Sequence, residues 1–311
     1  MNKYMPEGML ISEKENYEYI SSPEGLKRAQ RDGMILEGVA TLCDHSFNLH
    51  VELPCKMHAI IPRSEIAYSY TDEQIKDIAI LTRVGKPVAF KVLGFEQDGG
   101  GSYTAILSRR SAQRECYHNY IETLTPGDII PARVTHLENF GAFVDIGCGI
   151  VSLLSIDSIS VSRISHPSAR VCVGDAIYTI VKNIDDKGRI YVSSKELLGS
   201  WEENAAHFSE GQTVRGIIRS IESYGIFVEL KPNLAGLAEY KEDAEVGAGA
   251  AVYIKSIIPE KMKIKLIIIA AEDVADYPSP LEYYIDTKSV THIDNWRYSP
   301  KISKRIIESV F

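Results

Sequence analysis

Residues 140–146 read Phe-Gly-Ala-Phe-Val-Asp-Ile, and residues 224–230 read Tyr-Gly-Ile-Phe-Val-Glu-Leu. Successive side chains of a β-strand point to opposite faces, so every second residue of each copy can enter a core. The inward residues are Ala142, Val144 and Ile146 in the first copy and Ile226, Val228 and Leu230 in the second. Phe143 and Asp145 must then point outward, as must Phe227. An aromatic ring on the outside of a strand, present twice, indicates a surface on which bases stack.

Each copy belongs to a longer repeat of short strands. Gly127 and Gly211 precede the first strand of two repeats, and Gly33 lies one similar period upstream, which predicts an earlier third repeat. A Val-Gly pair recurs late in each repeat, at 84–85, 173–174 and 246–247. Several short strands with turns between them, within roughly 60–80 residues, are typical of a small closed β-barrel. We therefore predict an all-β chain of three tandem barrels.

The segments outside the barrels look helical or irregular. Ser22 and Pro23 predict the capped start of a short helix near Pro23–Arg31. The last segment carries several prolines and a possible last helix from Pro300 to Val310. The predicted domains are an N-terminal helical segment at 1–31, a divergent barrel at 32–110, a helical linker at 111–126, a barrel at 127–197, a helical linker at 198–209, a barrel at 210–270 and a C-terminal tail at 271–311.

The net charge of −8 at first argues against a nucleic-acid partner. Its distribution matters more, because the three barrel regions are close to neutral and the excess of acid lies in the linkers and the tail. A near-neutral barrel can still bind a single strand by stacking beside a local cluster of cations. We expect weak to moderate affinity.

Other features exclude several classes of protein. Five cysteines without regular spacing fit a reducing cytoplasm, and Cys43, His45, Cys55 and His58 match no zinc-binding pattern. The N-terminus lacks an apolar signal core, and no apolar run reaches membrane-spanning length, so we expect a cytoplasmic protein. There is no phosphate loop, nucleophile elbow or dinucleotide fingerprint. We therefore expect no catalytic residues, metal, cofactor, membrane partner or small-molecule substrate.

Further motifs surround the first copy in the central repeat. They read Gly-Asp at 127–128, Arg-x-x-His-Pro-Ser at 163–168, Val-Gly-Asp at 173–175 and Asp-x-x-Gly-Arg-Ile-x-x-Ser-x-Lys at 185–195. With these motifs the repeat resembles the S1 RNA-binding domain family, whose fold is a five-stranded OB-type barrel. The third repeat is also similar to this family, and the first is less so. The array resembles a short, three-repeat, Firmicutes-type form of the bacterial ribosomal protein S1 family. The resemblance implies three tandem S1-type OB-fold barrels with short helical linkers.

In this family RNA lies against two aromatic residues of the second strand, a histidine after the third strand, and an Asp/Arg pair on late strands. For the central repeat the resemblance implies Phe140 and Phe143 as the rings. It implies Arg189, with Asp185 or Asp186, as the pair.

The histidine position is where the repeats depart from the family. In the central repeat it falls on Ser152, which weakens polar contact there. In the third repeat it falls on Glu239, whose charge would repel phosphate, while Tyr224 and Phe227 are the rings and Lys263 replaces the arginine.

Strand alternation supports the same face. The outward residues of the two closing strands are Arg189, Tyr191 and Ser193 in the central repeat and Lys263 and Lys265 in the third. A cation beside exposed rings suits a single strand, because bases stack on the rings and the cation pairs with phosphate. His166-Pro167 is expected to shape the connection between the third and fourth strands, and His166, in a loop beside that face, is a further candidate for RNA contact. For each ring the alternative is a packing role beneath a neighbouring segment.

The first repeat departs most. Its second strand shows Asn48, His50 and Glu52 outward, Phe47 alone precedes it, and Thr104 holds the cation position. Its stacking surface is absent or rebuilt.

Two functions remain open. The first is non-enzymatic binding of single-stranded RNA, as mRNA, in translation at the small ribosomal subunit. The alternative is a protein-interaction scaffold that docks to the ribosome, a ribonuclease or RNA polymerase with minor RNA contact. A fragment of an RNA-processing enzyme is a third reading, which needs a catalytic domain that this chain lacks.

Overall fold

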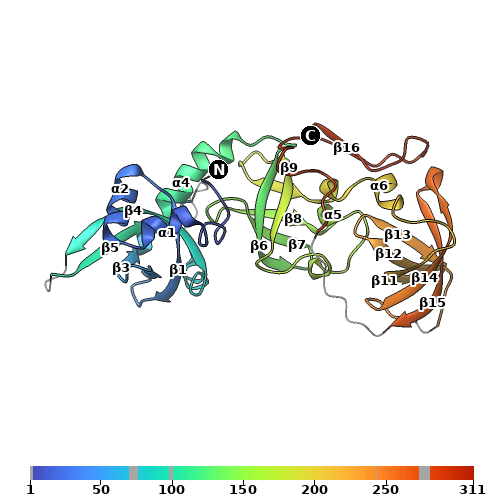
Figure 1. Cartoon of the computed structure of the whole chain (residues 1–311), viewed down its shortest axis with the longest axis horizontal. Coiled ribbons are helices and arrows are strands. Elements are labelled where there is room, and N and C mark those ends of the chain that lie inside the picture. Colours follow the sequence, from blue (N-terminus) through green and yellow to red (C-terminus); the bar gives the residue numbers. More distant parts are fainter. Residues whose placement is uncertain (1–2, 70–75, 98–100, 243, 273–280) are drawn as a thin grey trace. The chain divides into compact units, whose positions relative to one another are not determined.

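The computed structural model describes residues 3–69, 76–97, 101–242, 244–272 and 281–311. Three closed barrels of five strands each carry the fold (Figure 1), so the predicted architecture of three tandem OB-type barrels is confirmed. The chain divides into two compact units. The first comprises Met1–Leu124 with Asp145–Val151, and the second comprises Thr125–Val144 with Ser152–Phe311. Barrel 1 lies in the first unit; barrels 2 and 3 and the tail lie in the second, apart from residues 145–151.

The three barrels share one topology, in which the third and fifth strands pair in parallel. Barrel 1 consists of β1 (Leu36–Cys43), β2 (Leu49–Glu52), β3 (His58–Ile61), β4 (Pro87–Gln97) and β5 (Tyr103–Ser108). Barrel 2 consists of β6 (Ile129–Glu138), β7 (Gly141–Asp145), β8 (Val151–Ser155), β9 (Ala176–Ile184) and β10 (Ile190–Ser193). Barrel 3 consists of β11 (Thr213–Glu222), β12 (Gly225–Lys231), β13 (Leu234–Ala238), β14 (Gly249–Ile258) and β15 (Lys263–Glu272).

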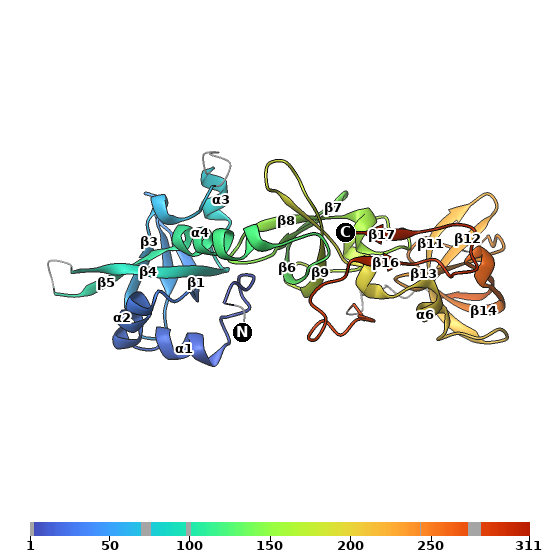
Figure 2. The same ribbon diagram turned by 90° about the horizontal axis from the view of Figure 1, so that it is seen from above.

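Short helices connect and flank the barrels. In the first unit they are α1 (Lys14–Ile20), α2 (Pro23–Asp32), η1 (Arg63–Glu65), α3 (Asp77–Leu81), α4 (Arg109–Asn119) and η2 (Ile121–Thr123). In the second they are α5 (Ile156–Ile159), η3 (Pro167–Ala169), η4 (Lys195–Leu198), α6 (Trp201–Ala205) and η5 (Pro259–Lys261). The predicted helix at 23–31 is confirmed as α2: the Ser22 hydroxyl accepts a hydrogen bond from the Gly25 amide, and Gly33 ends the helix at a φ of +66°. Figure 2 shows α1 and α2 beside barrel 1.

The glycine of each quoted motif is required by a close approach of two strands. A side chain on Gly141 would lie 2.5 Å from the carbonyl oxygen of Leu154, and one on Gly225 would lie 2.5 Å from that of Ala238. Real Cβ atoms do not come so close, so β7 and β12 can start against their neighbours only at a glycine. The residue just before this glycine, Phe140 or Tyr224, is thereby placed at the tip of the turn.

The tail packs on both barrels of the second unit. Tyr283, Val290 and Phe311 lie with Ile129 and Ile180 of barrel 2 in one apolar cluster. The buried side chains of Trp296 and Tyr298 join the core of barrel 3. This packing covers the β6–β9 side of barrel 2.

The predicted last helix from Pro300 to Val310 is wrong. Instead, β16 (Asn295–Arg297) pairs with β17 (Glu308–Val310) as a two-stranded ribbon. The Ser303 hydroxyl accepts a hydrogen bond from the amide of Arg305, and the Tyr298 amide donates to the carbonyl of Ile307. Such side-chain and cross-strand bonds offer the backbone partners that a helix would otherwise supply.

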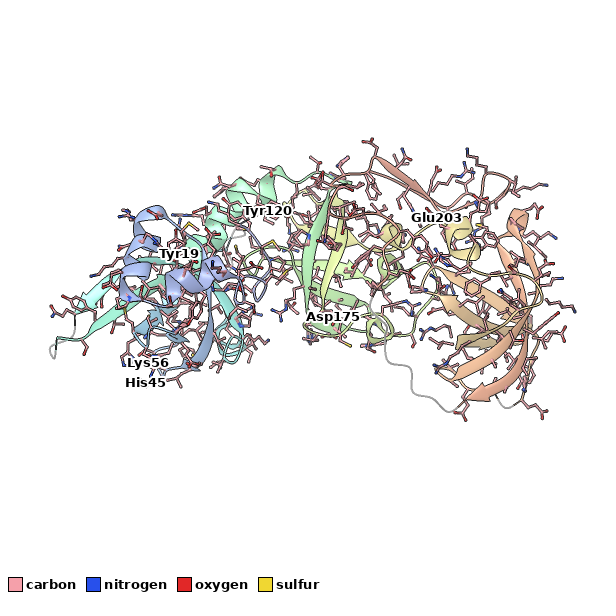
Figure 3. The ribbon with its side chains drawn as sticks, viewed as in Figure 1. Tyr19, His45, Lys56, Tyr120, Asp175 and Glu203 are labelled. Atoms are coloured by element: carbon pink, nitrogen blue, oxygen red, sulfur yellow. The ribbon has the colours of Figure 1, made fainter. Side chains whose placement is uncertain are left out.

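The N-terminal segment of the first unit is held by buried ion pairs. The Glu7 carboxylate accepts from Nε of Arg109 at 2.6 Å and from Nη2 at 3.0 Å, and both side chains are almost fully buried. Burial alone would raise the pKa of Glu7, but the guanidinium of Arg109 holds it below its ordinary value. Nearby, the ring of Tyr4 stacks on that of Tyr120 at 5.9 Å between centroids (Figure 3 labels Tyr120 at the end of α4).

Asp145 belongs to the same cluster, so its predicted exposure is wrong. Its carboxylate is 1% exposed and accepts from the amides of Glu7 at 2.7 Å, Gly147 at 2.8 Å and Gly149 at 3.0 Å. The side chain does leave the barrel interior, as alternation predicts, but the N-terminal segment covers it. Burial, together with the charge of Glu7, raises the pKa of Asp145 to about 7.

Glu37 adds a third buried acid beside Glu7 and Asp145. Its Oε2 accepts from the amides of Gly8 and Leu10, both at 3.0 Å, and its Oε1 has no hydrogen-bond partner among the described residues. Burial, reinforced by the charges of Glu7 and Asp145, raises the pKa of Glu37 from 4.5 to about 8. The carboxyl group is therefore protonated at neutral pH.

This shift predicts a loss of stability as pH rises. The folded protein keeps a proton that the unfolded chain releases above pH 4.5, so Glu37 costs on the order of 3 kcal/mol of unfolding free energy between pH 4.5 and 7, and more up to its folded pKa. Glu37→Gln should remove this part of the pH dependence, which urea unfolding at pH 5, 7 and 8.5 would measure. The exposed Glu52→Gln is the control. Parallel pH profiles for Glu37→Gln and wild type would contradict the assignment.

Candidate nucleic-acid interface

Barrel 2 presents a pair of aromatic rings at the start of β7. The ring centroids of Phe140 and Phe143 are 6.0 Å apart and their planes are perpendicular. Phe140 is 55% exposed because it sits at the turn before Gly141, and Phe143 is half-buried on the outer face of the strand. The outward direction predicted for Phe143 therefore agrees with the structure.

A third ring, His136 of β6, was not foreseen. It lies nearly parallel to Phe143, with 6.3 Å between centroids and 22° between planes. Alternation counted from the buried Val134 would place His136 inside the barrel. In barrel 3 the residue that corresponds to His136 is Ser220, 84 positions later in the sequence. There the pairing of β11 with β12 shifts by one residue between Ile218 and Ser220. A bulge at this place turns the next side chain outward.

The cation of barrel 2 stands at the entry to β10. Arg189 is exposed, and its amide donates to Asp185 Oδ1 at 2.8 Å across the turn. This hydrogen bond is the main cause of the lowered pKa of Asp185, to which the Tyr191 hydroxyl and the Arg189 charge also contribute. Asp185 is thus the acid that organises the turn, while Asp186 points to solvent.

The outward row continues along β10 and β8. Tyr191 is half-buried and pairs with Leu153 across the parallel strands. Ser193, predicted to be outside, is buried: its hydroxyl donates to the carbonyl of Ser158 at 3.0 Å, because α5 covers the end of the strand. Ser152 is also buried and donates to the carbonyl of Ile190 at 2.6 Å, so the histidine position predicted there faces away from the rings.

Barrel 3 repeats the ring pair. The centroids of Tyr224 and Phe227 are 6.1 Å apart with nearly perpendicular planes, and Tyr224 is 69% exposed. Strand pairing places Phe227 in one row with Leu237 and then Lys265. Neighbouring strands lie about 4.8 Å apart, so the ammonium group of Lys265 is within reach of a nucleotide stacked on Phe227.

The cations of barrel 3 match those predicted, but its histidine position does not. Lys263 and Lys265 are both exposed, with Ile264 buried between them. In the parallel pairing of the third and fifth strands, Leu153 lies opposite Tyr191 in barrel 2 and Leu237 lies opposite Lys265 in barrel 3. Leu237 is therefore the counterpart of Leu153. The residue before it, Gly236, is then the counterpart of Ser152, and Glu239 is not. Glu239 lies beyond the end of β13.

Barrel 1 has no such pair of rings at these positions. On the second strand of barrel 1, His50 pairs with Leu42, and at the same place in barrel 3 Phe227 pairs with Ser220. A histidine therefore holds the place of the second ring. Phe47 holds the place of the first, at a φ of +62°, and the guanidinium of Arg63 lies 5.0 Å from its ring centroid. The stacking surface of barrel 1 is therefore rebuilt.

His166 serves as a cap in the structure. Its Nδ1 accepts from the amide of Ser168 at 3.1 Å, at the start of η3. The ring is half-buried in the loop between α5 and β9. These contacts fix the loop and leave direct contact with RNA as a hypothesis.

Two barrels each carry a pair of perpendicular rings beside a cation, an arrangement that suits a repeated nucleic-acid-binding face. Comparison with known proteins identifies the family: a model described as "S1 RNA binding domain" matches residues 29–109 and 123–195, which contain barrels 1 and 2. The chain belongs to the S1 RNA-binding domain family, as predicted.

Several curated relatives are similar to this chain over part of their length. The small ribosomal subunit protein bS1 of Staphylococcus saprophyticus is 35% identical over 44% of this chain and 36% of its own length. That of Staphylococcus aureus is 28% identical over 73% of this chain and 61% of its own length. The chain thus spans between about a third and three fifths of the length of these relatives. A solved multidomain protein with nucleic acid binding domains from Streptococcus pneumoniae covers 76% of this chain and 73% of its own, at 15% identity and a TM-score of 0.24.

Proposed function

We propose that this protein binds single-stranded RNA, in particular mRNA, through barrels 2 and 3, without catalysis. The observation that carries the proposal is the repeated pair of rings beside a cation, Phe140 and Phe143 with Arg189, then Tyr224 and Phe227 with Lys265. Stacking accepts any unpaired base, so sequence preference should be low. The pattern of paired rings and neighbouring cations is the chemistry that a flexible strand requires.

The relatives supply the setting. Because they are small ribosomal subunit proteins, we infer that the chain acts in translation, on the small ribosomal subunit in the cytoplasm. In the part of the chain that the structure describes, no helix is long and apolar enough to cross a membrane.

The test is the affinity for a short unstructured RNA, measured by fluorescence anisotropy at two salt concentrations. Phe143→Ala should weaken binding by about 1–3 kcal/mol, since a stacked base loses its ring, and Phe227→Ala should act in the same direction. Tyr17→Ala removes a 57% exposed ring from α1 and should leave the affinity unchanged. RNA binding that ignores both phenylalanines would remove the basis of the proposal.

The rebuilt face of barrel 1 favours a second function for that barrel. With His50 and Phe47 in place of a free ring pair, we infer that barrel 1 docks to a protein, such as one of the ribosome, a ribonuclease or RNA polymerase. Binding to RNA falls with salt in proportion to the phosphates contacted, whereas apolar docking does not. Salt-insensitive association of the chain with ribosomal subunits would support this role.

A further inference from the structure

The outer surface of barrel 3 carries an exposed apolar face on β14 and β15, which lie side by side in Figure 1. Tyr253 and Ile267 pair across these antiparallel strands and are 36% and 40% exposed, and Ile269, further along β15, is 56% exposed. Large apolar side chains that gather on one face of a protein mark an interaction surface. We propose that this apolar face, Tyr253 with Ile267 and Ile269, docks an acidic, apolar segment of a partner protein.

Tyr253 has a counterpart in barrel 2, which is Ile180. Ile129 pairs with Ile180 across β6 and β9, and Thr213 pairs with Tyr253 across β11 and β14. Thr213 follows Ile129 by 84 residues, which is one period of the repeat. A large apolar side chain on this outer surface is therefore a shared feature of the two barrels.

In barrel 2 this place is covered by the chain itself. Ile180 is fully buried in an apolar cluster with Tyr283 and Ile285 of the tail. Barrel 3 is built differently here, because β15 continues as a strand where barrel 2 turns into η4 after β10. Within the ranges that the structure describes, no segment buries Tyr253 as the tail buries Ile180. The face of barrel 3 is thus left for a segment of another molecule.

The tail indicates which kind of segment fits such a place. Residues 282–286 read Glu-Tyr-Tyr-Ile-Asp, so the two side chains that pack on barrel 2, Tyr283 and Ile285, lie between acids. One of these acids, Glu282, forms an ion pair with Lys231 at 2.8 Å. Aromatic and aliphatic side chains flanked by carboxylates therefore already cover the counterpart of the apolar face.

The rim of the apolar face is basic, which favours the same chemistry. Lys255 of β14 and Lys265 of β15 are both exposed at one end of it. At the other end, Lys241 Nζ donates to the carbonyl oxygen of Ile269 at 3.1 Å. None of these three lysines forms an ion pair with a residue in the described part of the chain. Complementary charges orient a partner, so an acidic segment fits this rim, whereas a second copy of the face would set lysine against lysine.

The aliphatic centre separates this face from the ring pairs. Bases stack on aromatic planes, and Ile267 and Ile269 offer none. Aliphatic side chains gain instead from the removal of apolar area from water, which the apolar side chains of a protein segment provide. Docking at this face goes beyond the proposed binding of RNA and does not depend on it.

The test uses a fluorescent peptide with the sequence of residues 281–294, which contains three acids and one lysine. Anisotropy should show saturable binding of the peptide to the full chain. Ile267→Thr/Ile269→Thr should weaken it roughly ten-fold, because apolar area is lost while the β-branched shape is kept. The matched control is Ile302→Thr/Ile306→Thr, at two tail sites that are each 59% exposed, and it should retain the wild-type affinity. Tryptophan fluorescence in urea checks that both variants fold.

A second variant tests the charge of the rim. Lys241→Gln/Lys255→Gln should weaken binding of the peptide several-fold and make it less sensitive to salt, because two of the three cations are removed. Its affinity for RNA should stay close to that of wild type, since Lys265 and the rings remain. A peptide affinity equal to that of wild type would contradict the acidic character of the partner.

The remaining outcomes distinguish the possible occupants. No binding of the peptide to wild type, or equal binding by the two isoleucine variants, would overturn the proposal. A loss of RNA affinity in Ile267→Thr/Ile269→Thr as large as that in Phe227→Ala would assign the face to RNA. A wild-type dimer that Ile267→Thr/Ile269→Thr abolishes, measured by sedimentation, would assign it to a second copy of the chain. If wild type binds no RNA, only the proposed function fails, and the peptide still decides the role of this face.

Discussion

Glu229→Gln should lower the unfolding free energy of the second unit by about 3–5 kcal/mol, because it removes the buried carboxylate that pairs with Arg170 and Arg219. The side chain of Arg170 is 3% exposed and that of Arg219 is 12% exposed, so solvent cannot replace the missing carboxylate. Arg170 comes from the loop before β9 of barrel 2, and Glu229 lies on β12 of barrel 3. The substitution should therefore loosen the packing of these two barrels as well as lower stability.

The two tryptophans of the chain make this measurement specific. Trp201 and Trp296 both lie in the apolar cluster of barrel 3, so urea unfolding followed by tryptophan fluorescence reports on the second unit. Glu222→Gln, at an exposed site on the neighbouring strand, is the matched control. Adding Arg170→Met to Glu229→Gln should recover part of the stability, since a neutral side chain costs less to bury than a guanidinium that has lost the Glu229 carboxylate. A fluorescence midpoint within error of wild type for Glu229→Gln would contradict this account.

Arg109→Met should destabilise the first unit by a similar amount, about 3–5 kcal/mol. It removes the main cation of the buried Glu7 carboxylate, and Arg83 at 3.4 Å is a poorer substitute. It also removes the donor to the carbonyls of Ile66 and Gly149.

The adjacent Arg110→Met is the control, because its side chain is 51% exposed and reaches Glu65 only at 3.9 Å. For Arg109→Met we expect an earlier unfolding transition by far-ultraviolet circular dichroism, with the tryptophan transition of the second unit unchanged. Equal circular dichroism transitions for Arg109→Met and Arg110→Met would show that the buried pair does not stabilise this unit.

Alternation and the repeat period predicted the three barrels and the directions of Phe143, Phe227 and Lys265, because strand geometry depends on neighbouring residues. Alternation failed at His136, which is exposed although it lies two residues after the buried Val134. It also failed where a distant segment covers a strand, as at Asp145, because exposure depends on the whole fold.

The buried charged cluster of the second unit shows the same limit more strongly. Arg170, Glu229 and Tyr284 are separated by more than fifty residues each, and nothing in their local sequence brings them together. The tail illustrates it on a smaller scale: its helix prediction followed local composition, but the backbone found partners in the ribbon of β16 and β17. Local pattern predicted the scaffold, and long-range packing decided which polar groups the scaffold gathers.

Glu52, Asp145 and Glu229 occupy one column of the repeat array, at the same point of the second strand in each barrel. The first is open to water, the second is bound by backbone amides of the N-terminal segment, and the third is bound by an arginine of the preceding barrel. Tandem domains are often treated as independent and interchangeable. Here, moving a barrel to another place in the chain would bury its carboxylate without the amides or the arginine that bind it now. The order of the three barrels therefore depends on the surroundings of these three acids, and a permuted array should fold less well than the natural one.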